Sequence, residues 1–327
     1  MYREKDENYS IIKAIPGTLR AYDEVNEIDT TKPTLIALGG NMTDNPQLAL
    51  GMSRIAKSLL GLNLSDEISN FARDGNINTY SINYGVGDSE DYLSSTYLSS
   101  EEIHELTMKI FYHQIFKTDK ELFTFDEIKN NFSKIHFFTH CYGGYVLKKV
   151  VESLCELCTI VGLNYLQIKE CLSAITAINY APLEIPELIT NINIISLSDD
   201  ITDNKKYAEL CPYPITIHTE ENNLNILSKK IVSNEKERGY INDHNIKNLY
   251  RTNKWQCGFY DISEGTFSDF IYTGGNAECI SEIVSHIMGE QLSISLRNNN
   301  EEKLTTKQMA DLAQNIIKYY SEEQLSK

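Results

Sequence analysis

Short runs of apolar residues recur along the chain and predict the strands of a buried sheet. The clearest run is Thr34–Leu38, which is apolar after its first residue and leads into two glycines. Strands buried on both faces read as continuous apolar runs, and parallel sheets are built from such strands. Comparable runs predict central strands at 77–84, 134–139, 173–180 and 191–197, an edge strand at 9–14, and a short strand or loop edge at 215–219.

Amphipathic helical patterns alternate with these runs. In the clearest pattern, just after Cys141, apolar residues recur at helical spacing and charged residues occupy the opposite side. The apolar positions are Val146, Leu147, Val150, Val151, Leu154, Cys155 and Cys158. Other helices are predicted at 46–62, within 88–133 from an N-cap near Ser99, at 276–292 and at 305–320. This alternation predicts an α/β fold with a mostly parallel sheet, in a single domain over residues 1–327.

The charge balance argues against a nucleic-acid partner. Lys and Arg number 30 against 46 Asp and Glu, which gives a formal net charge of −16. A surface of this sign repels phosphate backbones and anionic lipid headgroups. A small-molecule or lipid acyl substrate is compatible with it, because a local patch can oppose the overall charge. The sequence leaves the oligomeric state open.

The N-terminus and the cysteines indicate the compartment. No apolar segment follows the basic residues near Met1, so no Sec signal peptide is predicted, and no apolar run approaches the roughly 18 residues of a transmembrane helix. Seven irregularly spaced cysteines argue against a disulfide framework. Cys155 and Cys158 have a redox or zinc-like spacing, but both fall on the apolar side of the helix, which favours a buried pair. We expect a protein that is cytoplasmic where it is made, with later export left open.

The stretch Thr-His-Cys-Tyr-Gly-Gly, from Thr139 to Gly144, is the motif that points to chemistry. It resembles the nucleophile elbow of the α/β-hydrolases, in which a nucleophile occupies a tight turn between a strand and a helix. The elbow needs small residues two positions before and two after the nucleophile, and Thr139 and Gly143 meet this demand. Cysteine replaces the usual serine, and Thr139 replaces the commoner glycine. Without the resemblance, Cys141 would be an ordinary buried residue beside a glycine turn.

The resemblance covers roughly residues 33–250, by the order of elements. It implies an α/β-hydrolase-like sheet flanked by helices, with helical cap insertions at 88–133 and 200–250. Cys141 would be the nucleophile, and the helix that follows would lower its pKa.

The resemblance also implies an oxyanion hole after the 34–38 strand. The backbone N–H of Gly40 or Asn41 would join that of Tyr142, although the glycines could equally form a plain turn.

The same family places an acid and then a histidine after the nucleophile. Asp199 and Asp200 follow the predicted 191–197 strand, and Asp199 is favoured, although a loop cap would explain both residues. The later histidines are His218, His244 and His286. His244 is favoured as the base because it lies in a polar loop, with His218 as the alternative, whereas His286 falls inside a predicted helix.

The implied activity is hydrolysis of an ester, thioester or lactone through a Cys-His-Asp triad and a covalent acyl-enzyme, without a metal or cofactor. Dienelactone hydrolases are similar in having cysteine at this elbow. Polyhydroxyalkanoate synthases also carry such an elbow, so an acyltransferase is an alternative. A catalytically inert binding protein with the α/β-hydrolase fold is a further alternative.

Overall fold

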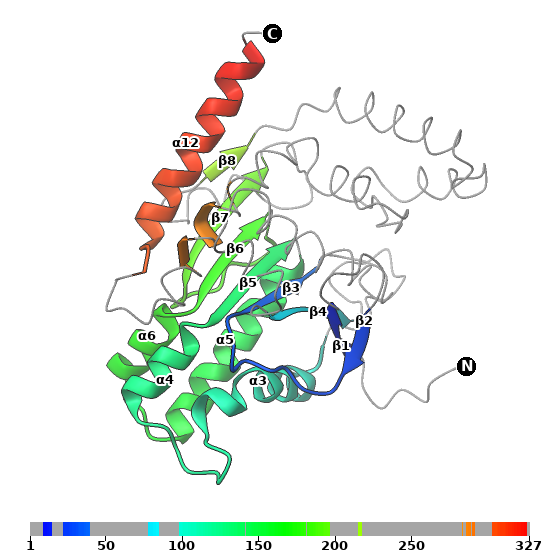
Figure 1. The fold of residues 1–327 in the computed structure, drawn as a ribbon, viewed down its shortest axis with the longest axis vertical. Helices are drawn as coiled ribbons and strands as arrows, with labels where there is room; N and C mark the ends of the chain where they lie inside the picture. Colours follow the sequence, from blue (N-terminus) through cyan, green and yellow to red (C-terminus); the bar gives the residue numbers. More distant parts are fainter. Residues whose placement is uncertain are drawn as a thin grey trace, which may run out of the picture.

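A computed structural model describes part of the chain, and its strands form one mixed sheet (Figure 1). The described residues are 9–14, 22–39, 78–84, 98–140, 142–180, 182–196, 215–217, 283, 286–288, 290–291 and 303–325. The strands among them are β1 (Tyr9–Ala14), β2 (Tyr22–Val25), β3 (Thr34–Leu38), β4 (Asn78–Tyr84), β5 (Ile135–His140), β6 (Thr176–Tyr180), β7 (Thr190–Ser196) and β8 (Ile215–Ile217).

The strand order in this sheet is β2-β1-β4-β3-β5-β6-β7-β8. The six strands from β4 to β8 are parallel, whereas β1 is antiparallel to both of its neighbours. The predicted α/β class and mostly parallel sheet are therefore confirmed. The 9–14 strand exists as β1, but β2 lies outside it at the edge.

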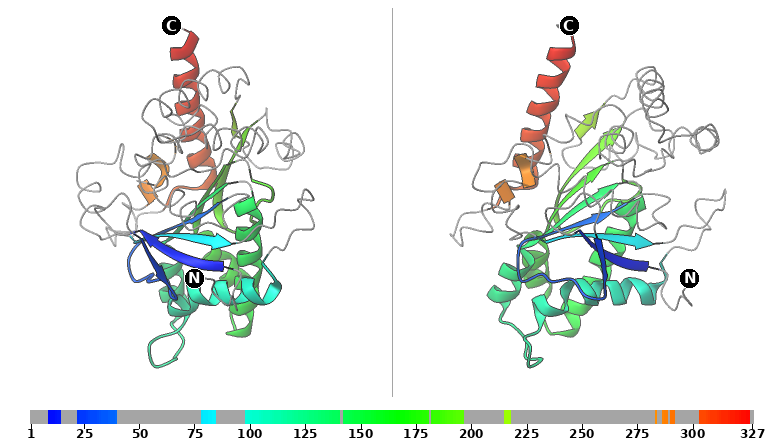
Figure 2. Two further views of the ribbon diagram at one scale, coloured as in Figure 1. Left: turned by 90° about the vertical axis from the view of Figure 1, so that its right-hand side faces the viewer. Right: turned by 45° about the vertical axis from the view of Figure 1, so that its right-hand side comes forward.

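Four helices lie on one face of the sheet, namely α3 (Ser100–Ile115), α4 (Phe125–Phe132), α5 (Tyr142–Ile160) and α6 (Tyr165–Ser173) (Figures 1 and 2). Alternate strand residues, such as Ile36, Phe137 and Ala177, share a buried core with α3 and α5. The apolar stripe predicted for α5 is confirmed, since its residues are buried except for the partly exposed Cys155. The described part of the predicted 88–133 cap, α3 and α4, belongs to this helical layer.

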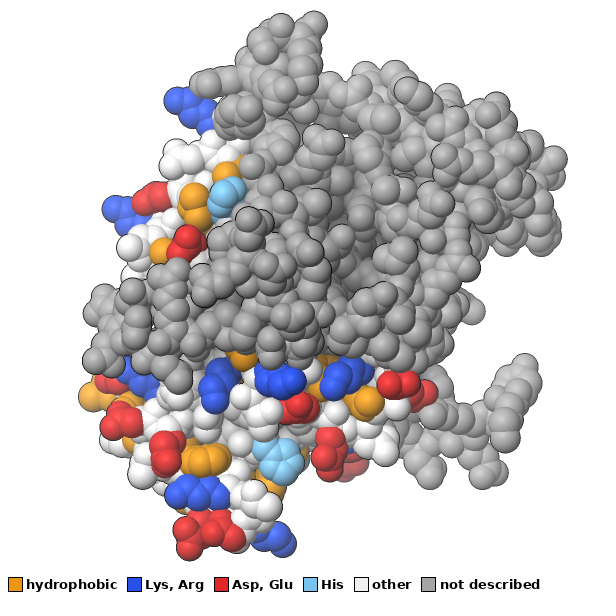
Figure 3. Space-filling model, viewed as in Figure 1, with side chains coloured by type: hydrophobic (Ala, Val, Ile, Leu, Met, Phe, Trp, Pro, Cys, Tyr) orange, Lys and Arg blue, Asp and Glu red, His pale blue; other side chains and the backbone are white. Residues whose placement is uncertain are grey.

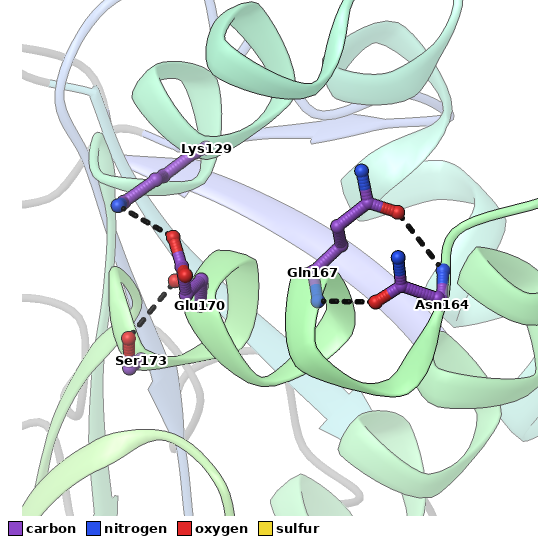
Figure 4. A network of polar contacts seen from close by, with 5 residues as sticks. All are labelled: Lys129, Asn164, Gln167, Glu170 and Ser173. Atoms are coloured by element: carbon purple, nitrogen blue, oxygen red, sulfur yellow. Dashed lines mark hydrogen bonds and ion pairs between the residues drawn. The ribbon is translucent and has the colours of Figure 1, made fainter.

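The helix α6 replaces the start of the predicted 173–180 strand. Asn164 accepts from the Leu166 and Gln167 N–H groups, and the Gln167 side chain accepts from the Asn164 N–H, a capping box that starts the helix (Figure 4). Ser173 Oγ donates to the Glu170 carbonyl in the last turn. The strand prediction was wrong at its first residues because Ser173 belongs to the last turn of α6 and Ala174 is its C-cap, so the strand starts only at Thr176.

Exposed side chains over the helical layer carry both charges (Figure 3). Lys129 Nζ lies 3.1 Å from Glu170 Oε2 and links α4 to α6, as Figure 4 shows. Lys149 Nζ lies 2.7 Å from Glu152 Oε2 within α5. Such exposed pairs contribute little to stability, so the buried core, and not these ion pairs, fixes the helices on the sheet.

The C-terminal helix α12 (Thr306–Leu325) contacts β7 and β8, on the other side of the sheet from α5 (Figure 2). Lys303, just before it, donates to the carbonyls of Ser133 and Ala174, which precede β5 and β6. Burial lowers the pKa of Lys303 to about 7. Burial and then the nearby Lys303 charge hold the pKa of the fully buried His136 on β5 well below its usual value. In the described parts of the chain, no helix has the length and apolar character to cross a membrane.

Candidate functional site

The strand order makes the carboxyl ends of β3 and β5 a topological switch point. The chain passes from β3 to β4 on one side, and from β5 to β6 on the other. In open α/β sheets, ligands bind at the carboxyl ends of strands whose connections diverge in this way. Leu38 of β3 pairs with Thr139 of β5, so the two strands end side by side. Cys141 lies outside the described residues and is the single residue between β5 and α5.

The start of α5 touches the end of β3, and this contact requires glycine. A Cβ added to Gly143 would lie 2.7 Å from the Leu38 carbonyl carbon, closer still to its oxygen, and 3.0 Å from the Gly39 oxygen. Carbon atoms in contact are normally about 3.5–4.0 Å apart. The small residue predicted two positions after Cys141 is therefore needed because the backbone of β3 passes directly beside it.

The next glycine is equally confined, on the other side of the helix. A Cβ on Gly144 would lie 2.5 Å from the Glu184 carbonyl oxygen and 2.8 Å from Pro182 Cβ. Lys148 Nζ, one turn along α5, lies 2.9 Å from Glu184 Oε2. This hydrogen bond is the main cause that raises the Lys148 pKa. The first turns of α5 are thus packed between the end of β3 and the loop that follows β6.

The polarity of the α5 N-terminus favours an anion at its first turn. The first N–H groups of a helix have no intrahelical acceptor, and the helix dipole places partial positive charge there. No residue in the first turn of α5 is acidic, so no carboxylate of its own compensates this charge. A thiol that immediately precedes such a helix has a lowered pKa. The position of Cys141 in the chain therefore suits a thiolate.

Buried polar side chains run across the sheet directly before the site. Thr139 Oγ1 donates to Asn179 Oδ1 at 2.6 Å, and Asn179 Nδ2 donates to Asn193 Oδ1 at 2.9 Å. These residues are paired in register on β5, β6 and β7, and none is more than 4% exposed. Thr139 was predicted only as a small residue of the elbow, and no site prediction included Asn179 or Asn193. Their signal was Asn inside consecutive central strands, where asparagine is normally depleted.

Of the predicted site residues, the structure describes Tyr142. It is the first residue of α5, is buried, and its ring stacks on that of Tyr145 at 5.3 Å between centroids. His286, the histidine that was not favoured as the base, is also described, and its side chain is exposed. The predicted residues that lie outside the described part of the chain are Cys141, Gly40, Asn41, Asp199, Asp200, His244 and His218.

Three other cysteines are described, and each is a free thiol. Burial raises the pKa of Cys158 to about 12 and that of Cys171 to about 11, and it also raises that of Cys155. Thiols of this kind carry almost no thiolate at neutral pH. Across the described ranges, no group of three or more His, Cys, Asp or Glu residues could hold a metal ion.

No protein-family model matches the chain, and a search of curated proteins finds no similar sequence.

Proposed function

We propose that this protein is an α/β-hydrolase-type enzyme that cleaves an ester, thioester or lactone, with Cys141 as the nucleophile. The observation that carries the proposal is the contact between Gly143 and the Leu38 carbonyl group. It supports a tight turn at Cys141, because the helix must start immediately beside the end of β3. An ordinary buried cysteine beside a loose glycine turn would not need this close approach.

The chemistry requires a base that takes the thiol proton, and His244 is the first candidate, with His218 as the alternative. The thiolate attacks the acyl carbon, and the bond from that carbon to the leaving oxygen or sulfur breaks. The imidazolium returns the proton to the leaving group. Asp199, or Asp200, would accept a hydrogen bond from the other ring nitrogen and hold the tautomer.

Water then completes the turnover. The same histidine accepts a proton from water, the hydroxide attacks the acyl-cysteine, and the carboxylic acid leaves as the thiol is restored. During both steps negative charge develops on the acyl oxygen. N–H groups of Tyr142 and of Gly40 or Asn41 would donate to it, and one such donor typically lowers the barrier by about 3–4 kcal/mol.

Alkylation and turnover test this proposal. Iodoacetamide should label Cys141 faster than the buried Cys158 and Cys171, at a rate that rises through a pKa below the free-thiol value of about 8.5. Turnover should be sought with activated acyl esters and thioesters of increasing chain length. Cys141→Ala should abolish turnover, whereas the control Cys155→Ala, in a partly exposed position on α5, should leave it unchanged.

Two outcomes contradict the proposal. If Cys141 is labelled no faster than Cys158, its thiol is not activated, and the inert binding scaffold becomes the better interpretation. If Cys141→Ala retains full turnover, another residue performs the chemistry.

A further inference from the structure

The row of side chains that starts at Thr139 extends across three strands and ends on backbone. From Asn193, Nδ2 donates to Asn191 Oδ1 at 2.8 Å. Asn191 Nδ2 then donates to the carbonyl oxygens of Pro186 and Ile189, at 3.1 and 3.0 Å. Each side chain in the row donates to the next acceptor, so the direction of the hydrogen bonds is the same from the Thr139 hydroxyl to the loop before β7. We call Thr139, Asn179, Asn193 and Asn191 the polar row.

The strands joined by the polar row are those that lead into the proposed site. β5 ends at His140, directly before Cys141, and Thr139 is its next-to-last residue. β7 ends at Ser196, shortly before Asp199 and Asp200. β6 lies between them and carries Asn179. The polar row is therefore the side-chain link between the strand of the nucleophile and the strand of the acid.

Burial makes this link specific to one register. A one-residue slip of β6 would turn Asn179 to the other face of the sheet and leave its amide, the Thr139 hydroxyl and the Asn193 oxygen buried without partners. A row of apolar side chains would discriminate less between the native and the slipped register, because it has no hydrogen bonds to lose. The row also explains why Thr139 stands at a position where the elbow pattern commonly has glycine, since glycine could not donate to Asn179.

We infer that Thr139 and Asn179 are positioning residues, which set the place of the Cys141 thiol relative to the acid and base through the polar row. This inference rests on the proposed function. Its consequence is that loss of one hydrogen bond in the row lowers kcat and raises the thiol pKa, because the nucleophile moves away from its partners while the substrate pocket is retained. A shift of about 1 Å commonly costs on the order of 100-fold in rate.

The experiment compares isosteric variants in the full chain. Thr139→Val removes the hydroxyl and keeps the shape, while Thr139→Ser keeps the donor. Thr107→Val is the matched control, because Thr107 is also fully buried and donates its hydroxyl to a backbone carbonyl, that of Ile103 on α3. For each variant, kcat and KM for one acyl ester, the thiol pKa from the pH dependence of Cys141 alkylation, and the urea midpoint are measured.

The inference predicts that Thr139→Val loses about 10- to 100-fold in kcat with KM nearly unchanged, and that its thiol pKa moves toward the free value. Thr139→Ser should behave as wild type. Thr107→Val should lose stability alone. If Thr139→Val does not fold, Asn193→Ala replaces it in the experiment. Asn193→Ala removes the hydrogen bond between β6 and β7 and leaves the hydrogen bond from Thr139 to Asn179 in place. This variant should show the same loss of kcat.

The results separate this inference from the proposed function. If wild-type turnover depends on Cys141 but Thr139→Val and Asn193→Ala behave as Thr107→Val does, the row has only a structural role and the inference is overturned. If wild-type protein has no Cys141-dependent turnover and no activated thiol, the proposed function itself fails and the inference falls with it.

Discussion

Replacement of Gly143 by alanine tests the packing on which the proposed site depends. The methyl group would lie 2.7 Å from the Leu38 carbonyl carbon and 3.0 Å from the Gly39 oxygen. Both neighbours are backbone atoms at the end of a buried central strand, so neither can rotate away as a side chain could. The start of α5 must therefore move away from β3 by about 1 Å to restore a normal contact of about 3.5–4.0 Å.

Such overpacking typically costs about 1–3 kcal/mol of folding free energy. At about 2–4 °C of melting temperature for each kcal/mol, Gly143→Ala should melt roughly 2–12 °C below wild type. The displacement lies immediately after Cys141, so the thiol moves with the helix. The kcat of the proposed hydrolysis should then fall by on the order of 100-fold.

Gly162→Ala is the control for a general loss of stability. Gly162 follows the other end of α5, has a φ of +91° and has no atom within 4 Å of an added Cβ. Alanine there is strained by about 1–2 kcal/mol through the backbone alone. Thermal unfolding should show a comparable loss for both variants, while steady-state kinetics and Cys141 alkylation should change only for Gly143→Ala. If Gly143→Ala melts with wild type and keeps its alkylation rate, α5 does not begin against β3, and the reasoning about the site is refuted.

Three further outcomes are expected. The folded-state pKa of His136 is lowered, so the buried neutral imidazole stabilises the fold above the unfolded pKa of about 6.5, and this stability is lost as the pH falls below that value. The free energy of urea unfolding at pH 7.5 and pH 5 should therefore differ less for His136→Leu than for wild type. An equal difference in both proteins would contradict the lowered pKa of His136. Lys303 has a folded pKa of about 7, so between pH 7 and about pH 10.4 the unfolded chain binds more protons than the folded one, and the free energy of unfolding should rise with pH. Lys303→Met should make this rise less steep. An equally steep rise in the variant would show that other groups cause it. In mass-spectrometric mapping at pH 7.5, Cys158 and Cys171 should stay unlabelled by iodoacetamide until the protein is unfolded; rapid labelling of either in native protein would mean that its surroundings are open.

Much of the fold could be predicted from local patterns. The apolar run of β3 is buried at every residue, and the apolar stripe of α5 faces the core. Both follow from local patterns, because the spacing of apolar residues along an element determines which of its faces is buried. The capping box at Ser99 likewise follows from three or four adjacent residues. The capping box of α6 at Asn164 carried the same kind of signal and was overlooked, and the strand after this helix was predicted to start at 173 and not at Thr176.

The candidate site was only partly accessible in this way. The elbow pattern identified Thr139, Gly143 and the start of α5 as a tight turn between a strand and a helix. The assignment of Asp199 depends on the order of elements, and that of His244 on this order and on its polar loop; both stay predictions because the two residues lie outside the described part of the chain.

What the sequence by itself determined is the approximate position of the central strands and of helices such as α3 and α5, since each depends on neighbours in the chain, whereas β2 and α6 were not predicted. Tertiary structure alone decided that β3 lies between β4 and β5, because strand pairing depends on the direction of each crossover and not on any local pattern. The tertiary structure also imposes the demand for glycine at position 143 and for a hydroxyl group at Thr139. The Leu38 carbonyl and the Asn179 amide that impose these demands are distant in sequence, and they become neighbours only when the sheet is assembled.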